Sequence, residues 1–155
     1  MNALNSADAF VRIITNKKRA LTRQLTQLNG HIHRTEVMIA RHDEKLAFLM
    51  HELRALQVTG MVTRDEMLLS VRKQGSLMMK QQYLLSEKDQ LTGTLNQCYI
   101  ERQHLHATLS ETEKRDYKFS NLINRLRRDR AYRIENQNEN EIQELSVYGG
   151  LRYGY

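Results

Sequence analysis

The first third of the chain carries a regular pattern of apolar positions. Steps that alternate between three and four residues connect them, and only Lys18, Thr35 and His42 interrupt the apolar series. A repeat of about 3.5 residues predicts an α-helix whose narrow apolar stripe winds around a second helix. We therefore expect a helix over residues 6–58 that belongs to a coiled coil.

A weaker pattern of the same kind continues through the middle of the chain. It runs over residues 63–133; the half of its stripe positions that are spaced by seven residues is nearly all apolar, and the other half is mixed. We expect a second helix over this range, with its stripe turned towards the first helix. The stripe positions expected to form the seam between the two helices are Leu21, Leu25, Leu28, Ile32, Ile39, Leu46, Leu84, Leu91, Leu95 and Leu105.

A short stretch separates the two helices. Gly60 suits the left-handed conformation that closes a helix, and Thr63 and Glu66 have the spacing of a capping box that opens the next one. The turn, over residues 59–62, should therefore be tight and should reverse the chain. The predicted fold is all-α: a long two-helix antiparallel coiled-coil hairpin.

The position of the turn also sets the register. A reversal at this point pairs Leu25 with Leu95 and leaves Arg115 and the residues after it without a partner in the first helix. The second helix should therefore protrude past the N-terminus. The last residues are rich in Asn, Glu and Gly, so we expect a hairpin over residues 1–133 and a flexible tail over residues 134–155.

The composition is typical of long solvated helices and gives the chain a positive net charge. The chain has no proline, 27% of its residues are charged, and its formal net charge is +6. Such a balance favours an acidic protein surface, a nucleic acid or an anionic membrane face as partner. Since no apolar run approaches the roughly 18 residues of a membrane span, we expect a soluble, cytoplasmic chain that does not insert into a membrane.

Positive charge gathers at the end of the predicted hairpin where both termini lie. There the second helix mixes basic residues with apolar ones that have no expected partner in the first helix. A helix that exposes an apolar stripe is normally completed by another molecule. The residues expected to contact this partner are Lys17, Lys18, Arg19, Ile123, Arg125, Leu126, Arg127, Arg128, Arg130 and Arg133.

No group of residues has the pattern of a catalytic or cofactor-binding site, so we expect neither an enzyme nor a bound cofactor. Two His-x-His pairs occur, His31 with His33 and His104 with His106. Residues two apart on a helix point away from each other, and we expect no metal site. Cys98 lies on the stripe and is expected to be a small buried residue.

A basic, proline-free hairpin with a short turn and unequal arms resembles the small stalk proteins of type III secretion and flagellar export, the FliJ/YscO family. The resemblance covers the chain up to about residue 133. The start of the second helix is most similar to the InvI/SpaM branch, in which a Ser/Thr-Arg-acid-Glu helix start precedes an Arg-Lys-Gln. Besides Thr63 and Glu66, the residues that carry this similarity are Arg64, Asp65, Arg72, Lys73 and Gln74.

The resemblance implies a central stalk. Such a stalk enters the pore of a hexameric secretion ATPase at the cytoplasmic face of the secretion apparatus and reaches towards the export gate protein. Two other classes stay open. A coiled-coil chaperone or escort for secreted proteins or their chaperones would use the same apolar stripe. A nucleic-acid binder would use the same basic end, but it normally adds stacking aromatics or a groove-reading helix, and we expect no nucleic acid partner.

Overall fold

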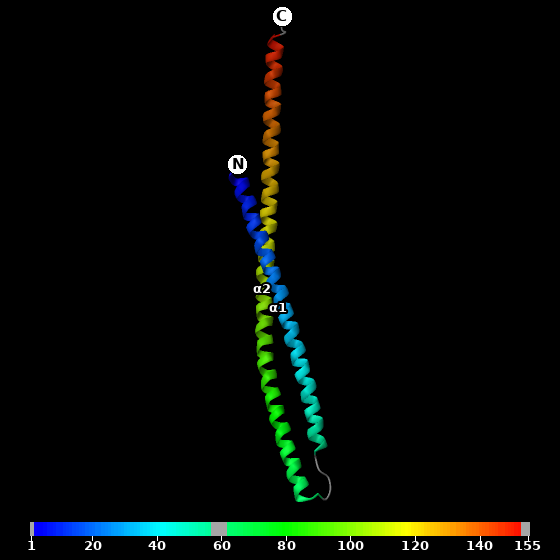
Figure 1. Ribbon diagram of the computed structural model, residues 1–155. Coiled ribbons are helices and arrows are strands. Elements are labelled where there is room, and N and C mark those ends of the chain that lie inside the picture. Colours follow the sequence, from blue (N-terminus) through cyan, green and yellow to red (C-terminus); the bar gives the residue numbers. More distant parts are fainter. Residues whose placement is uncertain (1, 57–61, 153–155) are drawn as a thin grey trace. The chain divides into compact units, whose positions relative to one another are not determined.

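The chain is built from two long α-helices. The computed structural model describes residues 2–56 and 62–152, which form α1 (Asn2–Ala55) and α2 (Arg64–Arg152) (Figure 1). The two helices pack against each other, and the described ranges contain no strand. The predicted all-α fold is confirmed.

Both helices contribute to each of two compact units. Unit 1 consists of Met1–Thr22 and Ala107–Tyr155, and unit 2 consists of Arg23–His106. Unit 2 therefore holds the end of α1 and the start of α2, whereas unit 1 holds the start of α1 and the end of α2.

The core of unit 2 is the seam that the apolar repeat predicts. Leu28, Ile32 and Cys98 form a buried cluster, against which Leu95 and Leu105 pack. The other seam positions of this unit are also buried or half-buried: Leu25, Ile39, Leu46, Leu84 and Leu91. The alternation of three and four thus identifies the buried stripe on both helices.

Polar residues on and beside this seam pair across the two helices. The Tyr99 hydroxyl donates a hydrogen bond of 2.6 Å to Glu36, and this carboxylate raises the pKa of Tyr99. Lys88 Nζ lies 2.6 Å from Asp43 Oδ1. Thr35, a polar interruption of the apolar series, donates to the His31 carbonyl one turn earlier, so its hydroxyl is satisfied within α1.

The register differs from the predicted one. Asp43, which the predicted reversal would place near Met78, pairs instead with Lys88. The reason lies at the end of unit 2 where α1 ends and α2 begins, which we call its closed end. Here the Ser70 hydroxyl donates to the Leu56 carbonyl (3.3 Å). The first turns of α2 therefore precede its contact with α1, and Met67 is 59% exposed.

The start of α2 has the arrangement of a capping box. Glu66 N–H donates to Thr63 Oγ1, and Thr63 N–H donates to Glu66 Oε2, both at 3.3 Å. These reciprocal bonds satisfy backbone donors that the first helical turn leaves without partners. Gly60 and most of the expected turn lie outside the described residues. The described part of α1 ends at Ala55 and α2 begins at Arg64, so the turn bounds 59–62 stay a prediction.

Unit 1 pairs the start of α1 with α2. Phe10 and Phe119 stack with ring centroids 4.5 Å apart. Leu21 and Ile14 are buried on α1, as is Ile123 on α2. The prediction that residues from Arg115 onward lack a partner in the first helix was wrong, because the register brings α1 alongside this part of α2.

The second helix also continues beyond its predicted end at Arg133, to Arg152. The stretch 134–148 is rich in Glu and Asn but contains no glycine or proline, so nothing in it stops a helix. Its side chains are exposed on all sides. The boundary at residue 133 is therefore corrected. The flexibility of residues 134–155 stays a prediction. Residues 153–155 lie outside the described part of the chain.

His42 is a buried polar residue in the seam of unit 2 that contacts the other helix. The ring is buried, and its Nε2 donates to Glu87 Oε2 at 2.9 Å. The Tyr83 hydroxyl donates to the same carboxylate and is the main reason that the pKa of Glu87 lies below its ordinary 4.5; burial opposes this shift, and the His42 contact and the charge of Lys45 add to it. The carboxylate thus joins His42 of α1 to Tyr83 of α2.

Glu87→Gln should reduce the stability of the chain at neutral pH. A carboxylate whose folded pKa is lowered contributes stability above its unfolded pKa, and it loses this contribution as the pH falls through the folded value. We expect the variant to melt below the parent at about pH 7, and the gap to narrow below about pH 4. Circular dichroism melts across this range measure it. Glu101→Gln, at an exposed position of α2, should follow the parent throughout; an equal loss in both variants would contradict the role of Glu87.

Candidate partner-binding site

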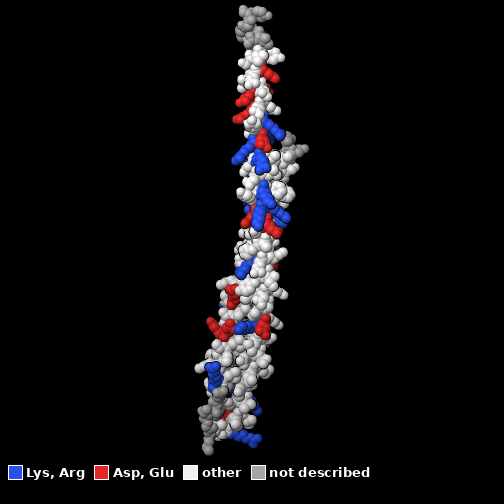
Figure 2. Space-filling view, turned by 180° about the vertical axis from the view of Figure 1, so that it is seen from behind, with Lys and Arg blue, Asp and Glu red and all other residues white. Residues whose placement is uncertain are grey.

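The most strongly charged surface of unit 1 is the basic segment, defined as residues 114–133 of α2. Figure 2 shows Lys and Arg side chains gathered on one stretch of the molecule, with acidic side chains following towards the C-terminus. The basic side chains of this segment are all exposed: Lys114, Arg115, Lys118, Arg125, Arg127, Arg128, Arg130 and Arg133. Asp116 and Asp129 are its only acidic residues.

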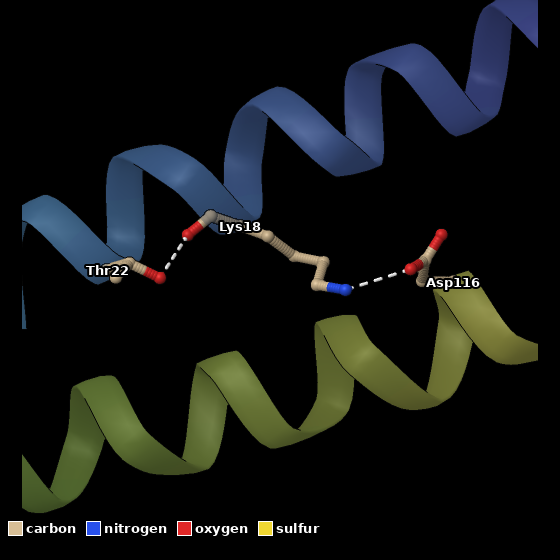
Figure 3. A network of polar contacts seen from close by, with 3 residues as sticks. All are labelled: Lys18, Thr22 and Asp116. Carbon is tan, nitrogen blue, oxygen red and sulfur yellow. Dashed lines mark hydrogen bonds and ion pairs between the residues drawn. The ribbon is translucent and has the colours of Figure 1, made fainter.

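Two expected contact residues are engaged inside the unit. Lys18 Nζ lies 2.9 Å from Asp116 Oδ2, and the Thr22 hydroxyl donates to the Lys18 carbonyl at 2.8 Å (Figure 3). Arg127 reaches Asp8 at 3.5 Å with a mostly exposed guanidinium. Lys18 and Asp116 both occupy seam positions, so their pairing is structural. It leaves Lys18 a poor candidate for partner binding.

The remaining charges divide into two groups along unit 1. Lys17 and Arg19 are exposed and flank Lys18, so they lie near Asp116, at the beginning of the basic segment. The arginines further along α2 are Arg125, Arg128, Arg130 and Arg133. Asp8 is the residue of α1 that lies beside Arg127, and Lys17 and Arg19 are about ten residues further along α1. The two groups are therefore separated along the unit. The expectation that Lys17–Arg19 lie alongside the arginines was wrong.

Ile123 and Leu126 do not form an open apolar contact. Ile123 is only 5% exposed, and Leu126 is half-buried. Both follow Phe119, which stacks on Phe10, so the seam of unit 1 continues through them. The predicted apolar patch is thus part of the core of unit 1. The exposed surface of the basic segment carries its Lys and Arg side chains together with Tyr117, Leu122 and Tyr132.

A shallow depression on α2 was not recognised from the sequence. Asn121, Asn124, Arg125 and Arg128 line about 260 Å³ of space. These residues are spaced by three and four, so they share one face of the helix, and this spacing was the available signal. Two guanidinium groups beside two amides can make bidentate contacts to carboxylates.

The stretch that carries the family resemblance lies in unit 2. Its residues Arg64, Asp65, Arg72, Lys73 and Gln74 are all exposed on the first turns of α2. Outside the capping box, no structural contact accounts for them. They are available to a partner rather than used in the seam.

The described residues hold no group of three or more His, Cys, Asp and Glu side chains that could bind a metal ion. No described helix is apolar enough over a sufficient length to span a membrane.

The two packed helices bury an apolar seam that includes a few polar residues, and they expose the basic segment. These features define a coiled-coil protein with a charged surface. Over residues 5–146 the chain matches the family described as Salmonella surface presentation of antigen gene type M protein, and it belongs to this family. The match confirms a relation to type III secretion, and the chain is a component of such a system. No curated protein and no solved structure matches the chain.

Proposed function

We propose that this chain is the central stalk component of the secretion export apparatus. In this role it engages the hexameric secretion ATPase at the cytoplasmic face of the apparatus and links it to the export gate protein. The observation that carries the proposal is the basic segment, whose eight Lys and Arg side chains are all exposed while Ile123 is buried in the seam. Such a surface suits an acidic wall rather than an apolar groove.

The geometry of two packed helices suits a ring-shaped partner. Two helices have no sixfold symmetry, so they touch six identical subunits unequally. A partner that binds some subunit conformations better than others shifts the equilibrium among them. Stiffness and charge are then sufficient, and no catalytic group is required. The escort alternative is less well supported at this end, because Ile123 and Leu126 are packed within unit 1.

The test is a charge reversal that spares the internal ion pairs. Arg125→Glu, Arg128→Glu and Arg130→Glu together leave Arg127–Asp8 and Lys18–Asp116 in place. We expect unchanged helicity, loss of the stimulation of ATP hydrolysis by the cognate ATPase, and blocked secretion. Binding of the parent should weaken with added salt, because exposed charges are screened within about 10 Å at 0.1 M.

A matched variant keeps the same change in net charge. Arg34→Glu, Arg41→Glu and Arg54→Glu alter exposed residues of unit 2 and should stimulate hydrolysis like the parent. Normal stimulation and secretion by the first triple variant would contradict the proposal. Nucleic acid that co-purifies with the parent and is lost with the first variant would instead favour the nucleic-acid class.

A further inference from the structure

Unit 2 carries an apolar groove beside the seam. It lies between α1 and α2, holds about 650 Å³ and is lined almost entirely by apolar atoms of Phe48, Leu49, Met79, Tyr83 and Leu84. Phe48 is 62% and Met79 75% exposed. Large apolar side chains this exposed, gathered on one face, are typical of a surface that another molecule covers.

A second depression extends the groove towards the closed end of unit 2. It is lined by Leu56, Leu77 and Ala55 and shares Lys80 with the first. From residue 73 to residue 84 of α2, the two together span about 17 Å at 1.5 Å per residue. This length accommodates three turns of a third helix, laid against both helices of the pair.

The rim of the extended groove is more basic than acidic. Lys45, Lys73 and Lys80 line it, against Glu44 and Glu52. An occupant that is apolar on one side and acidic beside it would match both the floor and the rim.

The chain itself contains such a helix. Residues 134–148 of α2, which we name the acidic segment, carry no Lys or Arg. Its acidic residues are Glu135, Glu139, Glu141 and Glu144. Its exposed apolar residues are Ile134, Ile142, Leu145, Val147 and Tyr148. At about 22 Å, its length is similar to that of the groove.

We propose that the groove of one copy binds the acidic segment of a second copy. Apolar side chains of the segment would cover Phe48, Met79 and Tyr83, and its glutamates would face the lysine rim. The Tyr83 hydroxyl is held by Glu87, so its ring is already placed as one wall of the groove. Binding then buries apolar area of both surfaces that is exposed to water in a single copy.

The occupant has to come from another copy. The groove and the acidic segment both belong to α2, which is one continuous helix from Arg64 to Arg152. A continuous helix cannot fold back on itself, so a chain with α2 intact cannot fill its own groove. The contact joins two different surfaces, which makes it a head-to-tail contact and allows a chain to bind one neighbour at each surface. This proposal uses none of the residues of the ATPase test.

Sedimentation equilibrium of the full chain tests the proposal. The parent should self-associate with increasing concentration. The groove variant, Phe48→Glu with Met79→Glu, and the segment variant, Ile142→Glu with Leu145→Glu, should each associate about 100-fold more weakly, which corresponds to about 2.7 kcal/mol. All four positions are exposed, so helicity should be kept. The control, Ile100→Glu with Tyr117→Glu, changes exposed residues outside both surfaces and should behave like the parent.

Mixing the two variants gives the sharper result. The segment variant retains an intact groove and the groove variant retains an intact acidic segment, so an equimolar mixture should form a complex of one copy of each. A parent that stays monomeric at all concentrations would overturn the proposal. A groove that binds only a helix of a different protein would give this result and would overturn the proposal too. Association that survives either variant, or a mixture that stays monomeric, would overturn it as well.

Discussion

Ile32→Asp is expected to lower the free energy of unfolding by about 2 to 4 kcal/mol, since it places a carboxylate in an apolar layer. Ile32 is 3% exposed and belongs to the buried cluster with Leu28 and Cys98. The cluster offers the new carboxylate no positive partner. Thermal melts followed by circular dichroism should show a clearly lower midpoint, and chemical unfolding gives the free energy.

Ile100→Asp is the matched control for this change. Ile100 lies two positions from Cys98 on α2 and is 67% exposed, so the same substitution leaves the carboxylate in water. We expect a loss of only a few tenths of a kcal/mol, from helix propensity. A similar loss in both variants would contradict the seam of unit 2.

Ile123→Asp is expected to disrupt unit 1 and, with it, the proposed stimulation of the ATPase. The side chain is 5% exposed and follows the stacked pair Phe10–Phe119 along the seam. A buried carboxylate here should cost about 2 to 4 kcal/mol, as at Ile32, because both side chains lie in a core of the same two-helix kind. Loss of helix at moderate temperature should accompany loss of stimulation, whereas reversal of the exposed arginines removes stimulation alone.

Ile13→Asp provides the comparison within unit 1. Ile13 is 63% exposed on α1, and its replacement should leave both the melt and the stimulation close to those of the parent. If Ile123→Asp unfolded nothing but still abolished stimulation, Ile123 would be a contact residue after all, and its burial in unit 1 would be irrelevant to function.

The buried stripe could be predicted from the sequence because each helix must bury one narrow face. Steps of three and four identified Leu28, Ile32 and Leu95 without knowledge of their neighbours. Polar residues also lie in the seam, since Lys18 of α1 pairs with Asp116 of α2.

The register could not be predicted in the same way. A periodic stripe matches its partner in several alignments, so the choice among them depends on polar pairs and on the connection between the helices. Gly60 and the capping box suggested a tight turn, but α2 runs through several residues before Ser70 meets Leu56. The resulting shift moved Ile123 from an expected partner surface into the seam, and it is the reason that the candidate site had to be redrawn.

The end of α2 was misjudged for a different reason. Asn-rich and Glu-rich composition indicated a tail, yet α2 continues through these residues to Arg152. The positions of the exposed arginines followed directly from the sequence. Their separation from Lys17 and Arg19 did not, because it depends on the register.

The cross-helix contacts also have an order along the chain. Leu56 and Ser70 are 14 residues apart in sequence, Glu36 and Tyr99 are 63 apart, and Asp8 and Arg127 are 119 apart. The entropy of closing a loop is lost once, at the connection, and each contact made there brings the next pair within reach. Folding can therefore proceed as a zipper from the connection outwards. The proposed ATPase-binding end would be completed last, so only a chain whose seam has already closed would present it.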